Sequence, residues 1–196
     1  MKKHVTIKEL GRGDVEFMAG WGTHEDPLFL HYNFPKLSHR ERGLWHHMKT
    51  SGIRKKCFAA INQENDVIGY ISMKHINYFR RISELGIVLD PARIGEGYGP
   101  IALESFMEMY FGKMKMEKLY LKVAKFNERA FKAYLKSGFN IENEVVEVFE
   151  EQEIEEKMIR EIMKKNPYLF YENGQIFCQY YSMSISRESW FSPQKE

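Results

Sequence analysis

The chain has 196 residues, of which 43% are hydrophobic and 14% aromatic, which is enough apolar surface for a folded core. Charged residues make up 29%, but they nearly balance to a formal net charge of +2 and form no basic block, which argues against a nucleic-acid binder. No apolar run has the length of a membrane span or a signal peptide. We therefore expect one cytoplasmic α/β domain over residues 1–196, with no membrane partner.

The first predicted elements are a strand and two helices. Residues 4–10 alternate polar and apolar side chains, which is the period of a half-buried strand, and residues 14–20 have a short helical pattern. A second helix is expected over residues 38–50, because Ser38 and Glu41 have the spacing of a capping box.

Three strands follow and lead into a glycine-rich loop. Apolar runs over residues 56–61, 67–76 and 81–90 are separated by short polar links, which favours an antiparallel meander. Residues 93–99 read RIGEGYG, with a glycine at every second position from Gly95, and a helical pattern then continues to residue 111.

The C-terminal half is predicted to contain three more strands around a well-delimited helix. That helix lies between Asn127, a favourable N-cap residue, and Gly138, a favourable C-terminal stop. The strands are expected over residues 118–124, 141–149 and 175–186.

Residues 150–165 are predicted to form an additional amphipathic helix. Ile154, Met158 and Ile162 fall on one face, and the glutamates come early and the basic residues late, as the helix dipole favours. We expect this apolar face either to cover the domain or to join two chains in a homodimer.

The glycine loop is a candidate phosphate site. Its N–H groups and the first turn of the next helix can bind phosphate oxygens. A P-loop is disfavoured because Gly99 is followed by Pro100 and Ile101 instead of Lys-Ser/Thr. A dinucleotide-binding fold is disfavoured because the glycine spacing is GxGxG and the preceding strands are predicted to be antiparallel. A plain turn that binds no ligand is the remaining alternative.

Two linked motifs resemble the GNAT acetyltransferase superfamily. The first, ELGIVLDPARIGEGYGPIALESFMEMYF, matches a family strand that ends in Asp-Pro or His-Pro before a glycine loop and a helix. The second, KLYLKVAKFNERAFKAYLKSGF, matches an Asn-capped helix that ends in Tyr-x-x-x-Gly-Phe. With the C-terminal NGQIFCQYYSMSISRESW, the chain is similar to the RimJ/RimL-like branch of ribosomal-protein N-acetyltransferases. The resemblance implies the GNAT fold, a mixed and mostly antiparallel central sheet flanked by helices, with residues 150–165 inserted.

The resemblance also implies acetyl-CoA as cosubstrate, bound in a gap between the strands GIVLD and KLYLKVA. The backbone of Ile87, Val88 and Leu89 would bind the pantetheine arm, and one of its N–H groups would stabilise the oxyanion of the reaction. Further cofactor contacts are expected at Ile94, Gly95, Glu96, Gly97, Tyr98, Gly99, Pro100, Asn127 and Phe131. Ile94 departs from the family, which commonly has Arg or Gln there, so the backbone is expected to hold the diphosphate.

Tyr134 and Glu84 are the candidate catalytic residues. Asn127 and Tyr134 lie seven residues apart and share a helix face, and the resemblance implies that Tyr134 is the general acid for the departing thiolate. A core tyrosine is the alternative.

The attacking amine needs a general base, and Lys122 stands where some relatives have a glutamate. Glu84 is therefore the candidate base in this chain, with an ion pair to Arg80 or Arg81 as its structural alternative.

The loop over residues 23–35 and the helix that follows it are expected to form one wall of the acceptor site. Tyr32 and Asn33 are candidate contacts, with core packing as the alternative. Between Glu142 and Glu156 there are eight glutamates and no Lys or Arg. A solvated face is the default interpretation of such a run, and the sharper hypothesis is an acidic entrance for a polyamine or an aminoglycoside.

A metal site is not expected. The seven histidines include no HxxxH pair, and Cys57 and Cys178 form no CxxC motif and are predicted to be buried free thiols. We predict an acetyl-CoA-dependent N-acetyltransferase acting on a protein N-terminus, polyamine, aminoglycoside or other small amine, by direct transfer in a ternary complex. The alternatives are a catalytically weak acyl-CoA-binding module and a nucleotide-binding protein of another class.

Overall fold

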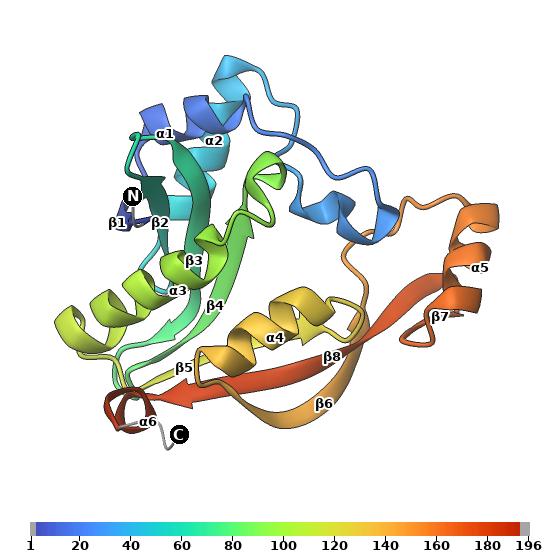
Figure 1. Ribbon diagram of the computed structural model, residues 1–196. Coiled ribbons are helices and arrows are strands. Elements are labelled where there is room, and N and C mark those ends of the chain that lie inside the picture. The colour runs from blue at the N-terminus through green and yellow to red at the C-terminus, as the bar shows by residue number, and fades with distance from the viewer. Residues whose placement is uncertain (1–2, 193–196) are drawn as a thin grey trace.

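The computed structural model describes residues 3–192 and contains one mixed sheet with helices on both faces (Figure 1). Within those residues the sheet has eight strands in the order β1-β2-β3-β4-β5-β8-β6, with β7 paired to β8. The strands are β1 (Val5–Glu9), β2 (Lys56–Asn62), β3 (Val67–Asn77), β4 (Ile82–Leu89), β5 (Lys118–Ala124), β6 (Asn140–Val148), β7 (Leu169–Glu172) and β8 (Gln175–Ser186). The helices are α1 (Arg12–Met18), α2 (His39–Thr50), α3 (Tyr98–Met107), α4 (Glu128–Lys136), α5 (Glu156–Lys165) and α6 (Arg187–Phe191). The predicted mixed, mostly antiparallel sheet is confirmed.

The strands β2, β3 and β4 form the predicted antiparallel meander, and β1 pairs antiparallel with β2 at its outer edge. On one face of this half-sheet, Val15 of α1 packs into a cluster with Cys57 and other β2 side chains. On the other face, Leu103 of α3 packs into a cluster with Phe58. The two clusters bury both faces of β2 and β3, so this half of the sheet forms a rigid base for the glycine loop.

The strands β4 and β5 run parallel but remain paired over a short distance, from Ile82–Lys118 to Glu84–Tyr120. Beyond these pairs β4 continues along β3, and β5 continues along β8. The two halves of the sheet therefore diverge in the middle of the molecule (Figure 1). This is the gap predicted between these two strands.

Tyr110 connects the two strands at their paired end. Its ring is 0% exposed and belongs to a π-helical segment, Glu108–Lys113, that continues α3. Its hydroxyl accepts a hydrogen bond from Ser83 Oγ of β4 at 3.0 Å and donates one to the carbonyl of Lys118 of β5 at 2.8 Å. One phenol thus bridges β4 and β5 just before they separate.

The long strand β8 organises the C-terminal half of the sheet. It pairs with β5 on one side and with β6 on the other, and the short β7 folds back on its first residues. Sequence reasoning misses β7, although Asn173 and Gly174 between β7 and β8 both have the positive φ of a tight hairpin, at 51° and 82°.

The inserted helix begins later than predicted, because residues 150–155 are not helical and α5 starts at Glu156. The side-chain amide of Gln152 donates to the carbonyl of Phe149 at 2.6 Å and of Ile176 at 3.0 Å, and its Oε1 accepts from the Ile176 N–H at 3.0 Å. These bonds hold the segment against β8 and compete with a helical conformation.

The predicted apolar face of this helix is partly wrong. Ile154 and Ile162 pack into a core cluster with Ile176 as expected, but Met158 is 45% exposed. The buried member is Ile159, which is 3% exposed. The inserted segment therefore packs on its own domain, over the first residues of β8.

We expect Tyr110→Phe to lower the free energy of unfolding by about 1–3 kcal/mol, because the buried Ser83 hydroxyl and the Lys118 carbonyl lose their shared partner. Chemical denaturation measures the change. Tyr171→Phe, at a side chain that is 59% exposed on β7, is the matched control and should be close to neutral. Equal stability of the two variants would contradict the bridging role.

Candidate functional site

A cavity of about 320 Å³ lies where β4 and β5 separate. Its walls come from β4, the glycine loop, the first half of α3, β5, α4 and the 3-10 segment Pro27–Tyr32. The volume is within the range of small-molecule sites. Segments that are far apart in the sequence therefore meet at the gap in the sheet.

Most of the predicted cofactor contacts line this cavity, and two do not. The lining includes Ile87, Val88, Leu89, Ile94, Gly95, Gly97, Tyr98, Gly99, Pro100 and Asn127. Phe131 lies outside the lining and stacks on Tyr181 of β8, with ring centroids 4.6 Å apart. Glu96 also lies outside it, and its side chain faces Lys3 at 3.7 Å.

The glycine loop has the geometry of a phosphate cradle. Gly95 and Gly97 have φ of 89° and 84°, a region that residues with a Cβ rarely adopt, and Gly97 is the N-cap of α3. A Cβ added at either position would meet nothing within 4 Å, so the cavity side of the loop is open. Free N–H groups at the start of an α-helix favour an anion, which fits the diphosphate of CoA.

Tyr134 of α4 reaches the same cavity and also packs against Phe139, with ring centroids 5.7 Å apart. Burial raises the pKa of the Tyr134 hydroxyl above its ordinary value of 10.0, and the neighbouring Tyr32 raises it further. The phenol therefore stays protonated at neutral pH, which is the form that can donate a proton.

Glu84 lies outside the cavity lining, at the paired end of β4. The predicted alternative of an ion pair with Arg80 or Arg81 is wrong, because its carboxylate lies 3.8 Å from His75 Nε2, while Arg81 pairs with Glu117 at 2.9 Å.

Lys122 of β5 does line the cavity, and its ammonium bonds Glu147 of β6. That bond is the main cause of its raised pKa, to which the charge of Glu84 also contributes. The charge of Glu84 therefore acts on Lys122, one of the residues that line the cavity.

The two predicted acceptor residues differ in position. Tyr32 lines the cavity, and burial raises its pKa to about 12, with hydrogen bonding to Asn127 acting in the opposite direction. Asn33 lies outside the lining and braces the loop. Its Oδ1 accepts from the His24 N–H at 2.6 Å, and its Nδ2 donates to the His24 carbonyl at 3.1 Å.

Sequence reasoning misses His24, Phe29 and Arg129, which also line the cavity. The loop over residues 23–35 contributes to the cavity wall through its 3-10 segment, whereas the helix after it, α2, contributes no lining residue. Burial lowers the pKa of His24, and the positive charge of Arg129 lowers it further. His24 is therefore held in its neutral form.

The acidic run divides into two structurally different parts. Three glutamates of β6 form ion pairs with lysines. Glu142 pairs with Lys118 and Glu147 with Lys122, both of β5, and Glu144 pairs with Lys125, the residue that follows β5. Beyond β6, the carboxylate of Glu150 faces His31 Nε2 at 3.3 Å.

Glu150 places a negative charge close to three tyrosines. Burial is the main cause of the raised pKa values of Tyr32, Tyr70 and Tyr180, and Glu150 contributes to each of them. The three phenols come from the 3-10 segment, β3 and β8, so the charge of this carboxylate acts on side chains of three different elements.

In the part of the chain that the structure describes, no helix combines the length and apolar character needed to span a membrane, and no group of three His, Cys, Asp or Glu side chains is arranged to bind a metal ion. Cys57 and Cys178 are buried free thiols, as predicted.

Comparisons with known proteins agree with this geometry. A family model for an acetyltransferase (GNAT) domain matches residues 4–140. The spermidine N(1)-acetyltransferase of Vibrio cholerae is 25% identical over 149 residues, which cover 76% of this chain and 86% of that protein. The spermidine N(1)-acetyltransferase of Escherichia coli is 33% identical over 86 residues, which cover 44% of this chain and 46% of that protein.

A solved structure is similar over nearly the whole chain. The crystal structure of spermidine N-acetyltransferase from Vibrio cholerae in complex with CoA and spermine has a TM-score of 0.72 and 21% identity, covering 96% of this chain and 99% of that one. The family match extends over both linked motifs and the cavity between them. The chain belongs to the GNAT acetyltransferase family and is an acetyl-CoA-dependent N-acetyltransferase.

Proposed function

We propose that this enzyme acetylates a primary amine of a polyamine. The observation that carries the proposal is Glu150, whose carboxylate lies 3.3 Å from His31 Nε2, and the His31 ring lies 4.0 Å from the ring of Tyr32 in the cavity wall. The charge of Glu150 also acts on Tyr32, Tyr70 and Tyr180. A carboxylate among aromatic rings favours a flexible cation, because it binds the charge while the rings pack on the methylene chain. The spermidine acetyltransferases among its relatives support the same substrate class.

Tyr134 is assigned as the general acid. Bound acetyl-CoA supplies the activated acetyl group, and its sulfur must receive a proton as the thiolate leaves. The Tyr134 phenol lines the cavity and is kept protonated by burial, so it can deliver that proton.

Glu84 is proposed as the base for the incoming ammonium. It lies outside the cavity lining, so the proton transfer would run through an intervening water. Lys122 is a poor base, because its bond to Glu147 raises its pKa and keeps the ammonium charged.

The narrower RimJ/RimL-like resemblance and the homodimer remain proposals. The RimJ/RimL-like resemblance would make a protein N-terminus the acceptor. Self-association is supported by a dodecameric structure of a Vibrio cholerae spermidine N-acetyltransferase, which has a TM-score of 0.67 to this chain. Light scattering of the purified chain measures the oligomeric state directly.

An acceptor panel tests the proposed function. The full chain is assayed for CoA thiol release with spermidine, spermine, an aminoglycoside, a simple monoamine and a peptide with a free N-terminus. We expect the highest kcat/KM for the polyamines. Preference for the peptide would replace the polyamine assignment with an N-terminal one, and thiol release that does not depend on any amine would favour a binding module.

We expect Tyr134→Phe to lower kcat by about 100-fold or more, with a small change in the KM for acetyl-CoA, because the variant keeps the ring and loses the proton. Tyr78→Phe, 53% exposed next to the β3–β4 turn, is the control. In the unmodified enzyme, Tyr134 should not cause kcat to fall as the pH rises toward 10.0, because its pKa lies above that value. Full activity of Tyr134→Phe would exclude it as the acid.

Replacing Glu150 by Gln should raise the KM for spermidine up to about fivefold, the effect of an exposed ion pair worth about 1 kcal/mol. The KM for a monoamine should change less, because a monoamine has no second ammonium. Glu161→Gln, on the exposed side of α5 where Glu161 pairs with Lys164, is the matched control. An unchanged KM for spermidine would remove Glu150 from acceptor recognition.

A further inference from the structure

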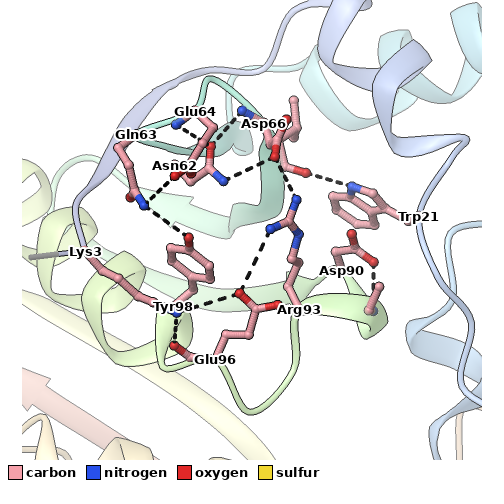
Figure 2. Close-up of polar contacts among 12 residues, drawn as sticks. Lys3, Trp21, Asn62, Gln63, Glu64, Asp66, Asp90, Arg93, Glu96 and Tyr98 are labelled. Carbon is pink, nitrogen blue, oxygen red and sulfur yellow. Dashed lines mark hydrogen bonds and ion pairs between the residues drawn. The ribbon is translucent and has the colours of Figure 1, made fainter. Parts of the chain in front are cut away.

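The residue before Ile94 offers a substitute for the Arg or Gln side chain that the family commonly has at the position of Ile94. Arg93 is the last residue of a short 3-10 turn, Pro91–Arg93, and is one of the residues that line the cavity beside the glycine loop. Its Nη2 donates to Asp66 Oδ2 at 2.7 Å. Figure 2 shows this pair at the centre of a polar network that connects the glycine loop with the β2–β3 turn.

The Asp66 end of the pair is itself fixed by the β2–β3 turn. Asn62, which is 4% exposed, accepts hydrogen bonds through Oδ1 from the N–H of Glu64 at 3.1 Å and of Asp66 at 2.7 Å. Just beyond the turn, the carbonyl of Val67 accepts a hydrogen bond from Trp21 Nε1 at 2.8 Å. Asn62 Nδ2 also donates to the Asp66 carboxylate at 3.3 Å, so this carboxylate has a partner in the turn besides Arg93.

The Arg93 end is fixed by the residues on either side of it. Asp90 Oδ1 accepts hydrogen bonds from the N–H of Gly22 and of Ala92, both at 2.9 Å, which ties the start of the 3-10 turn to the segment after α1. On the other side, Lys3 bonds the carbonyl of Glu96. The loop is thus anchored at both ends, with Arg93 between the anchors (Figure 2).

The bonding pattern leaves part of the guanidinium available. Asp66 occupies Nη2, whereas Nη1 lies 4.0 Å from the carboxylate of Glu96, which is beyond hydrogen-bond distance. An arginine has five N–H donors in a fixed planar fork, so fixing one edge orients the others. The Arg93 side chain is 35% exposed and borders the cavity, where such an edge can meet an anion.

We propose that Arg93 binds the diphosphate of CoA and that Asp66 is a positioning residue that orients its guanidinium. In this chain Arg93 takes over, from one position earlier, the contribution that Ile94 cannot make. The proposal rests on the use of acetyl-CoA and does not depend on which amine is the acceptor. In this proposal Asp66, on the β2–β3 turn, affects cofactor binding only through Arg93.

Calorimetry of the full chain with CoA tests both parts without an acceptor. We expect Arg93→Gln to weaken CoA binding about tenfold or more, the effect of losing a charge-assisted hydrogen bond, and Asp66→Asn to weaken it by a smaller factor. Dephospho-CoA, which keeps the diphosphate and lacks the 3′-phosphate, should show the same relative losses. A loss confined to CoA would assign Arg93 to the 3′-phosphate and overturn the diphosphate assignment.

A double-mutant cycle separates positioning from general damage to the fold. Adding Asp66→Asn to Arg93→Gln should cause no further loss of CoA affinity if Asp66 acts through Arg93. Arg93→Lys, which keeps the charge, should bind more tightly than Arg93→Gln. Arg81→Gln, which breaks the Arg81–Glu117 pair at the other end of β4, is the matched control and should bind CoA normally. Additive losses, or unchanged or tighter binding by Asp66→Asn, would overturn the positioning role.

Discussion

The separation of β4 from β5 is the constraint on which the other features of the molecule depend. Interior strands normally stay paired, because each buried backbone N–H and C=O needs a partner. Here the pairing ends after Glu84, and the later residues of β4 keep β3 on one side while Ile87 to Leu89 face the cavity on the other. The Tyr110 phenol holds the strands together at the point where pairing stops. Without that fixed end, the position of the open end would not be defined.

The open end brings together groups of opposite electrostatic preference. The glycine loop and the start of α3 present N–H groups to one end of the cavity, where Arg93 also lies. The acceptor side carries the carboxylate of Glu150. In the proposed arrangement, an anionic cosubstrate and a cationic acceptor enter from different sides and meet near Tyr134. The charge at each side would then favour one of the two substrates before any specific contact forms.

Local signals in the sequence predicted much of this arrangement. The Ser38–Glu41 capping box, the Asn127 cap and the glycine loop each depend on neighbouring residues, and each is found where the pattern places it. The start of α5 was not predictable, because Gln152 bonds Ile176, a residue far along the chain. The role of Tyr110 and the pairing of Glu84 with His75 likewise depend on contacts between elements. The β7 hairpin is different, since its Asn173-Gly174 turn is a local signal that could have been used.

The divergence of the strands also gives the sheet an interior edge. β5 leaves β4 after three residue pairs and continues with β8, so the two half-sheets are joined by few main-chain bonds. The smaller apolar clusters belong mainly to one half each, but the largest one spans both halves and includes Phe58 of β2 and Leu121 of β5, so cooperativity between the halves comes from this shared core and from the Tyr110 bridge. A molecule that occupies the gap can act as a missing strand and couple the two halves mechanically. The concentration of acetyl-CoA would then affect the stability of the folded enzyme in addition to its reaction rate.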